Sequence, residues 1–223
     1  LTVTSLFTPL VTGGAISVYH SEDAAGLIEQ IVADNRVDVI KMTPAHLALL
    51  QVLPIETWKA TRIIVGGEQL QGQLAQAISE RMPSVAIYNE YGPTETTVGC
   101  TVHQFIPQRD ANDAVPIGLP SNNTQAIVLD AFGLPAPIGV KGELFITGPG
   151  VATGYVARDT LNAECFVTLA QANNARAYRT GDVVRWRDDG RLMFVGRVDD
   201  QVKIRGYRIE LGEIEAVIAQ CSG

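Results

Sequence analysis

A turn followed by hydroxyl groups and a carboxylate is the first segment of this sequence that could do chemistry. The run Tyr91-Gly92-Pro93-Thr94-Glu95-Thr96-Thr97 follows an apolar stretch that reads as a buried strand. Polar groups placed in a loop next to the core are suited to binding a polar ligand. On turn chemistry alone, an ordinary β-turn with polar residues is the favoured explanation of the run. The other polar segments of the chain therefore have to separate these two interpretations.

Three further blocks follow in order along the chain. They are GELFITGPGVATGY at 142–155, YRTGD at 178–182 and GRVDDQVKIRGYRIELGEIE at 196–215. Together with residues 91–97, and at these separations, they resemble the signature motifs of adenylate-forming enzymes. The last block resembles in particular the amino-acid adenylation domains of nonribosomal peptide synthetases. The resemblance extends over essentially the whole chain.

This resemblance implies an ATP site. Thr94 would bind a phosphate, Tyr91 would lie against the adenine face, and an ionised Asp182 would accept from both ribose hydroxyls. The implied nucleotide-binding residues are Gly67, Asn89, Tyr91, Thr94, Asp182 and Arg197. The family also implies a Mg²⁺ ion held by Glu95, since this ion prefers carboxylate and phosphate oxygens.

The last block implies a moving joint. Asp199 would be the hinge about which a small C-terminal domain rotates between adenylation and thioester formation. Without the surrounding blocks, we would interpret Asp182 as a turn residue at the start of a strand and Asp199 as part of a solvated loop. The histidines His20, His46 and His103 have no spacing that indicates acid-base work, and we interpret them as incidental.

In this family, the side chain of the substrate amino acid is recognised by residues spread over the first half of the chain. The matching residues are Leu1, Thr4, Lys41, Ile64, Gly66, Glu90, Val98 and Gly99. A buried charge is costly unless it is paired, so Lys41 and Glu90 are expected to compensate each other around a polar guest. A carboxamide fits this pair, because its oxygen accepts from the ammonium and its NH₂ donates to the carboxylate. We therefore predict asparagine, with Asp, Gln or another polar side chain as the alternatives.

These side chains must be positioned by an α/β sheet. Apolar runs alternate with amphipathic stretches in the first half, which indicates βαβ units and a largely parallel sheet. We expect strands at 15–19, 37–41, 62–65 and 86–88, and helices at 24–35, 44–51 and 72–81. Ligands bind beyond the carboxyl ends of such strands, where Lys41, Gly66 and Glu90 fall.

From about Val115 the pattern changes to short strands separated by Gly and Pro. Strands are expected at 125–129, 142–147, 177–179, 183–187 and 192–194, followed by a final helix at 211–220. This spacing predicts a small, mostly β subdomain or distorted barrel. The predicted units are an α/β subdomain at 1–114, a β-rich subdomain at 115–198, and the hinge with the start of the C-terminal domain at 199–223.

Composition limits the possible partners. The chain has 223 residues and a net charge of -7, without a basic cluster, which disfavours a nucleic-acid or membrane surface. Its three cysteines are widely spaced and indicate neither a zinc site nor a disulfide framework, which fits a reducing cytoplasm.

Both ends read as cut, and three features of the family are expected outside the sequence. They are the phosphate loop, the aspartate that binds the substrate amine and the catalytic lysine, so the piece alone is expected to be inactive. The expected partners are the amino acid, a carrier domain bearing phosphopantetheine and a condensation domain. The alternatives are an acyl- or aryl-CoA ligase of the same superfamily, disfavoured by the charged pocket, and a non-catalytic binding fragment.

Overall fold

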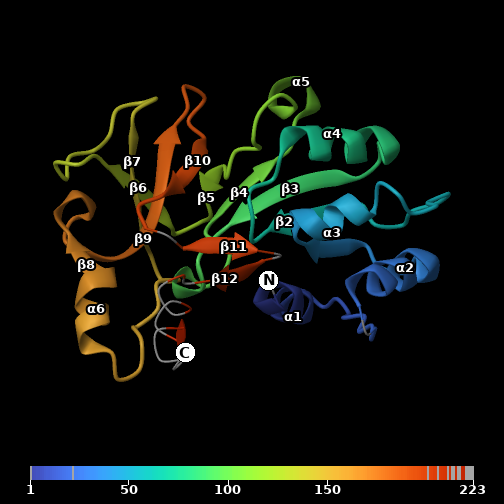
Figure 1. Cartoon of the computed structure of the whole chain (residues 1–223), viewed down its shortest axis with the longest axis horizontal. Helices are drawn as coiled ribbons and strands as arrows, with labels where there is room; N and C mark the ends of the chain where they lie inside the picture. The colour runs from blue at the N-terminus through green and yellow to red at the C-terminus, as the bar shows by residue number, and fades with distance from the viewer. Residues whose placement is uncertain are drawn as a thin grey trace.

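The structure is a computed structural model, and it describes residues 2–21, 23–199, 201–204, 206–209, 211, 214, 217 and 218. Two five-stranded sheets lie side by side, with a two-stranded hairpin next to their junction (Figure 1). The predicted α/β class, with a parallel-containing sheet and a separate β-rich part, is confirmed. Among the described residues, no helix has the length and apolar character needed to cross a membrane.

The first sheet has the strand order β1-β2-β3-β4-β5. Its strands are β1 (Val39–Met42), β2 (Arg62–Gly66), β3 (Ala86–Tyr91), β4 (Thr101–Gln104) and β5 (Leu119–Pro120). The first three are parallel, and β4 and β5 join in antiparallel pairing. The carboxyl ends of β1, β2 and β3 therefore meet at one edge, as expected for a ligand site.

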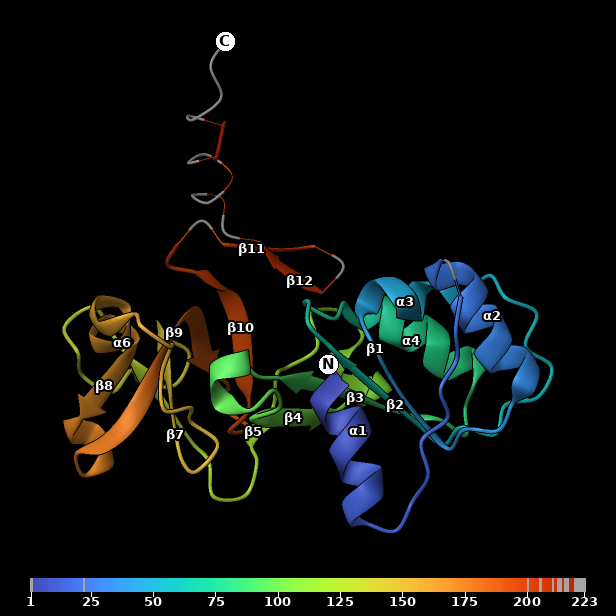
Figure 2. The same ribbon diagram turned by 90° about the horizontal axis from the view of Figure 1, so that it is seen from below.

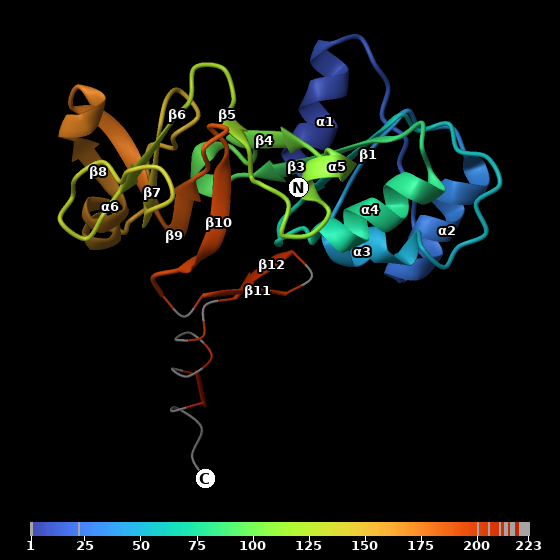
Figure 3. The ribbon, with the colours of Figure 1, turned by 90° about the horizontal axis from the view of Figure 1, so that it is seen from above.

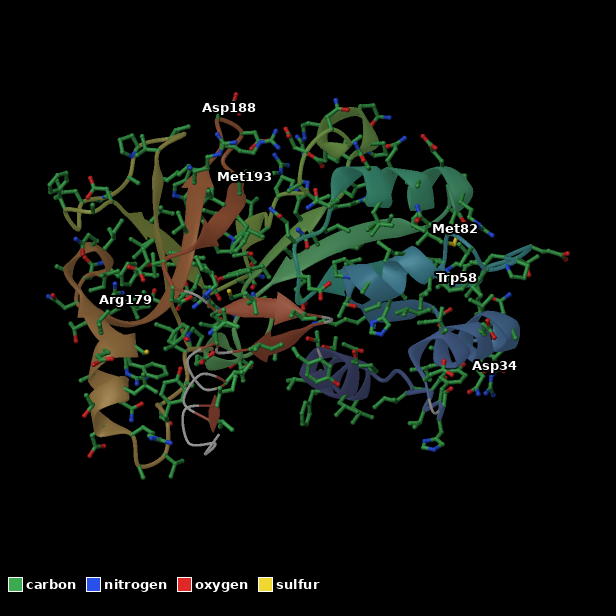
Figure 4. All side chains as sticks on the ribbon, in the orientation of Figure 1. Asp34, Trp58, Met82, Arg179, Asp188 and Met193 are labelled. Atoms are coloured by element: carbon green, nitrogen blue, oxygen red, sulfur yellow. The ribbon has the colours of Figure 1, made fainter. Side chains whose placement is uncertain are left out.

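Helices cover the two faces of this sheet unequally. Figures 2 and 3 show α2 (Ala24–Asp34), α3 (Pro44–Leu49) and α4 (Gly72–Arg81) on one side, and α1 (Thr2–Val11) on the other. The α2–α4 side holds the main apolar core, in which Ile63, Val65 and Leu47 have no exposed surface. Trp58 and Met82 belong to the same cluster and are labelled in Figure 4 near one end of it.

Helix ends follow local chemistry. Asp23 caps α2 by accepting from the Gly26 N–H at 2.6 Å, and Asn35 ends it in the left-handed conformation. Thr43 caps α3 and accepts from the His46 N–H, with Pro44 in the first turn, where its missing N–H costs nothing. These local signals explain why the sequence predicted both helices to within a few residues.

The second sheet has the order β10-β9-β7-β6, with β8 also paired to β9. Its antiparallel strands are β6 (Gln125–Leu129), β7 (Lys141–Thr147), β8 (Phe166–Leu169), β9 (Ala175–Trp186) and β10 (Leu192–Arg197). Helix α6 (Asp159–Cys165) precedes β8. Beyond this sheet, β11 (Val202–Ile204) and β12 (Tyr207–Ile209) form a hairpin. The remaining elements are α5 (Pro107–Asp110) and two 3-10 turns, η1 (Thr94–Thr96) and η2 (Ala170–Ala172).

Three expectations about secondary structure were wrong. Residues 15–19 form no strand, since they follow α1 on the surface, where Val18 is 87% exposed and no described strand pairs with them. The strands expected at 177–179 and 183–187 are one strand, because β7 pairs with both parts of it across a register shift. The third strand runs on to Tyr91, because the unpredicted β4 pairs with residues 88–91.

Two other expectations concern the boundaries of the predicted units. The first sheet extends to Pro120, past the boundary expected at 114. The division of the chain into three units stays a prediction. Of the final helix expected at 211–220, residues 211, 214, 217 and 218 are described and helical, and the rest lies outside the described residues. Leu1 also lies outside them.

Candidate functional site: a cavity between the two sheets

A cavity of about 680 Å³ lies where the carboxyl ends of β2 and β3 meet β9, β10 and the β11–β12 hairpin. All six residues implied to bind nucleotide line it: Gly67, Asn89, Tyr91, Thr94, Asp182 and Arg197. Gly66, Glu90 and Val98 of the implied substrate set line it too, as does Asp199. The tertiary structure therefore brings together segments that are separated by more than a hundred residues in sequence.

Asp182 is the buried acidic centre of this cavity, with 2% of its surface exposed. Its Oδ1 accepts from the Arg197 guanidinium at 2.6 Å, and its Oδ2 accepts from the Tyr91 hydroxyl. Arg197 lies directly across from it in the β9–β10 register. Burial, and then the charge of Asp182, raise the pKa of Tyr91 well above its usual value, so this phenol remains a neutral donor.

Arg197 connects this centre to the segment that follows β10. Its Nε and Nη2 donate to Oδ1 and Oδ2 of Asp199, both at 2.6 Å, and its Nη1 also donates to the Thr180 carbonyl at 3.1 Å. Burial opposes the guanidinium charge, but the carboxylates of Asp199 and Asp182 outweigh it and raise the pKa of Arg197. Asp199 is thus held by a two-bond contact to a cavity residue.

Asn89 and Gly67 also line this cavity. The Asn89 amide nitrogen donates to the Val115 and Pro116 carbonyls at 3.0 and 2.9 Å, which leaves its carbonyl oxygen as the group suited to accept from a ligand. Gly67 follows the end of β2 with φ of +90°, a conformation that favours glycine. The chain can therefore turn sharply at the edge of the cavity.

The implied side-chain pocket lies on the α1 face of the first sheet. Lys41 pairs with Ile64, and Gly66 with Glu90, so these residues lie on one face of neighbouring strands. The Lys41 ammonium contacts Glu90 Oε2 and donates to Thr4 Oγ1 at 2.8 Å. The Lys41 side chain is only 3% exposed and that of Glu90 14%, so this is a nearly buried ion pair.

Gly99 and Val98 complete this pocket. A Cβ on Gly99 would lie 2.6 Å from Glu90 Cδ, so a larger residue there would require the Glu90 side chain to move. Val98 has φ of +74°, which is strained for a β-branched residue. Lys41, Thr4, Ile64 and Gly99 do not line the 680 Å³ cavity itself, whereas Glu90 lines it and also binds Lys41, linking the two regions.

Glu95 lies on η1 and is 7% exposed, while its neighbour Thr94 is exposed and lines the cavity. Glu95 Oε1 accepts from the Tyr155 hydroxyl at 2.5 Å. Within the part of the chain that the structure describes, no group of three or more His, Cys, Asp or Glu side chains could hold a metal ion. Any ion held by Glu95 would need most of its ligands from elsewhere.

A family model described as AMP-binding enzyme matches residues 1–156, which include the first sheet and both sides of the Tyr91–Glu95 turn. The chain belongs to the AMP-binding enzyme family. The family resemblance inferred from the four sequence blocks is thereby confirmed.

Relatives within this AMP-binding family are peptide synthetases. A mycosubtilin synthase protein of Bacillus subtilis is 50% identical over 220 residues, which cover 98% of this chain and 8% of the relative. Bacitracin synthase 3 of Bacillus licheniformis is 48% identical over 217 residues, which cover 96% of this chain and 3% of the relative. The chain spans less than a tenth of the length of these proteins.

Solved structures agree with this family membership. The Vibrio cholerae adenylation domain AlmE, in complex with glycyl-adenosine-5'-phosphate, has a TM-score of 0.87 and 28% identity, covering 98% of this chain and 42% of that chain. An NRPS protein containing adenylation and PCP domains has a TM-score of 0.85 and 30% identity, covering 95% of this chain and 43% of that chain.

Sequence reasoning missed several contacts of this AMP-binding fold. His103 is 4% exposed and its Nε2 lies 2.7 Å from Asp110 Oδ2, a structural contact that the sequence did not indicate. Lys203 lies 5.6 Å from the centre of the Tyr91 ring, close enough for a cation–π contact. Glu68 accepts from the Gly206 N–H at 2.9 Å and attaches the hairpin to the cavity rim. None of these partners is marked by spacing in the sequence.

A second, smaller cavity of about 350 Å³ contains none of the implied site residues. It lies between the α5 region and the turn that joins β9 to β10, where Figure 4 labels Asp188 and Met193. Arg109, Arg187 and Asp110 line it, and each arginine forms an ion pair with Asp110, so its charges are partly compensated.

Proposed function

We propose that this chain is the nucleotide- and side-chain-recognition part of a nonribosomal peptide synthetase adenylation domain. The parent enzyme would use ATP to activate an amino acid as aminoacyl-AMP and transfer it to the phosphopantetheine thiol of a carrier domain. The observation that supports this most is the convergence of all six implied nucleotide residues on one cavity. The carrier domain and a neighbouring condensation domain are the partners we expect, in the cytoplasm.

The cavity offers each part of a nucleotide a suitable group. Asp182 is held by Tyr91 and Arg197 and has lone pairs to accept from two ribose hydroxyls. The Tyr91 ring offers a face for adenine, and the Asn89 carbonyl oxygen can accept from its exocyclic amine. Arg197 and the exposed Thr94 supply donors for the phosphates, and Gly67 allows close approach of the backbone.

Glu95 would hold Mg²⁺ in this scheme. A single protein carboxylate is sufficient, because Mg²⁺ is usually held by one or two carboxylates, several waters and the substrate phosphates. The buried Glu95 beside the exposed Thr94 fits that arrangement. When bound, the ion would neutralise phosphate charge.

Asparagine is the substrate that we propose. Its carboxamide oxygen would accept from the Lys41 ammonium and its NH₂ group would donate to the Glu90 carboxylate. The nearly buried Lys41–Glu90 pair supports this choice, since an apolar guest would desolvate both charged groups further without offering either of them a hydrogen bond. The same pair argues against an acyl- or aryl-CoA ligase, for which an apolar pocket would be expected.

Amino-acid-dependent pyrophosphate exchange tests this proposal. The assay compares a longer protein, which includes the expected phosphate loop and catalytic lysine, with the 223 residues alone, which should be inactive. Asparagine should give the fastest exchange among the proteinogenic amino acids and a set of carboxylic acids. Faster exchange with an apolar or aryl acid would reject the asparagine assignment.

Glu90→Gln tests the pocket directly. Removing the negative charge should raise the ratio of aspartate to asparagine activity by about tenfold or more, because two carboxylates in contact repel by a few kcal/mol near a protein surface. Glu29→Gln, the same change at an exposed position on α2, is the matched control and should leave the ratio unchanged.

A further inference from the structure

The loop before α6 reaches across to the turn that carries Glu95. Tyr155 is the last residue of the second sequence block, to which we assigned no role, and its hydroxyl donates to Glu95 Oε1 at 2.5 Å. We propose that Tyr155 is a positioning residue for Glu95, which holds the carboxylate in the orientation needed for magnesium-bound ATP. This inference rests on the proposed function, since it needs Glu95 to act at the metal.

The backbone of Tyr155 is itself held in place from α6. Asn162 Oδ1 accepts from the Tyr155 N–H at 2.6 Å, and Asn162 Nδ2 donates to the Tyr155 carbonyl at 2.8 Å. Gly154 has φ of +140°, and a Cβ there would lie 2.7 Å from Asn162 Oδ1. Glycine at 154 therefore lets one asparagine side chain bind both main-chain groups of the next residue.

The ring of Tyr155 is fixed by aromatic packing. Phe166 lies edge-on to it with ring centroids 5.4 Å apart, and Phe166 also packs against Tyr178, which lines the cavity, at 5.2 Å. The Arg176 guanidinium covers Phe166 at 4.5 Å from the ring centre. With both its ring and its backbone held, Tyr155 presents its hydroxyl from a defined position.

Two further hydrogen bonds join the same segments. The Ala152 N–H donates to the Glu95 carbonyl at 2.8 Å, and Thr97 Oγ1 donates to the Gly150 carbonyl at 2.7 Å. The turn that carries Glu95 is thus bound through its main chain and its side chain to a loop more than fifty residues later. A contact made only for packing would not require a hydroxyl aimed at one carboxylate oxygen.

The chemistry of the contact suits a role beside a metal. The donor is a phenol hydroxyl that gives one hydrogen bond to the carboxylate. Groups that orient metal-binding carboxylates in this way typically change metal affinity about 10- to 100-fold when they are removed.

Tyr155→Phe, in the longer protein, is the test. Binding of ATP is measured calorimetrically over a series of Mg²⁺ concentrations, and binding of AMP is measured without the metal. The variant should need about tenfold more Mg²⁺ for half-maximal ATP binding, with AMP affinity unchanged. Tyr19→Phe is the matched control, because Tyr19 also donates to a carboxylate, that of Asp34, at 2.5 Å but does not line the cavity.

Asn162→Ala provides a second variant that acts through the Tyr155 backbone and should shift the Mg²⁺ requirement in the same direction. An unchanged requirement in a Tyr155→Phe protein that melts like the wild type would overturn the proposal. So would tighter Mg²⁺ binding, which would mean that Tyr155 competes with the ion, or an equal loss of AMP affinity, which would mean a general structural role. Wild-type protein without any amino-acid-dependent exchange would instead reject the proposed function, and this inference with it.

Discussion

The Lys41–Glu90 pair allows one prediction whose size can be worked from the structure. Glu90→Leu removes the carboxylate and leaves a Lys41 ammonium, 3% exposed, with Thr4 Oγ1 as the acceptor that the structure records for it. Breaking a buried ion pair by removing one partner costs about 3 to 5 kcal/mol. We expect about 3 kcal/mol of lost unfolding free energy, the lower end, because the Thr4 hydroxyl remains.

Removing Lys41 should cost less unfolding free energy than removing Glu90. Lys41→Met keeps the volume of the side chain and leaves a Glu90 carboxylate that is 14% exposed and lines the open cavity. Water can solvate that carboxylate, so we expect a loss of about 1 kcal/mol. The double variant has no uncompensated charge and should be within about 1 kcal/mol of the wild type.

Urea unfolding of all four proteins, followed by circular dichroism, measures the coupling between the two residues. The expected coupling is about 3 kcal/mol, and it should persist at high salt because buried pairs are screened little. Two single losses that add within about 0.5 kcal/mol would refute the reasoning, since Glu90 would then not compensate a buried Lys41 charge.

Three other changes have defined outcomes. Asp182→Asn should weaken nucleotide binding about 10- to 100-fold in calorimetry, because a charged hydrogen-bond acceptor is lost. Gly118→Ala should destabilise by about 3 kcal/mol or more in urea unfolding, since its Cβ would lie 2.0 Å from a main-chain oxygen, whereas Gly133→Ala, in open space at a similar φ, should cost about 1 kcal/mol. Burial lowers the pKa of His103 below its usual 6.5, although Asp110 opposes this, so the unfolded chain takes up the proton first as the pH falls. Stability should therefore fall below pH 6.5 by at most about 1.4 kcal/mol per pH unit, and His103→Gln should remove that part of the slope.

Local patterns were sufficient for much of the framework. The predicted helix at 72–81 and strand at 125–129 have the observed bounds, because amphipathic spacing and turn residues are properties of a short segment. The four motif blocks were sufficient for the family, since their order and spacing lie in the sequence itself.

What the local patterns did not contain was pairing over long distances. The strand β4 was not predicted, and it is what extends β3 to Tyr91. The residues expected as two strands at 177–179 and 183–187 became one because β7 lies beside them. A short strand depends on its neighbour for its hydrogen bonds, so its limits are decided by the assembled sheet.

The sequence by itself was sufficient to indicate the family. It also showed which side chains could bind a nucleotide, and that two opposite charges lie in the first half of the chain. Only the tertiary structure decided which of them meet. The Tyr91 hydroxyl contacts Asp182 91 residues away, and Glu95 contacts Tyr155 60 residues away. No local propensity encodes such contacts. They form when the packed sheets bury polar groups from distant segments together, because a buried polar group needs a hydrogen-bond partner.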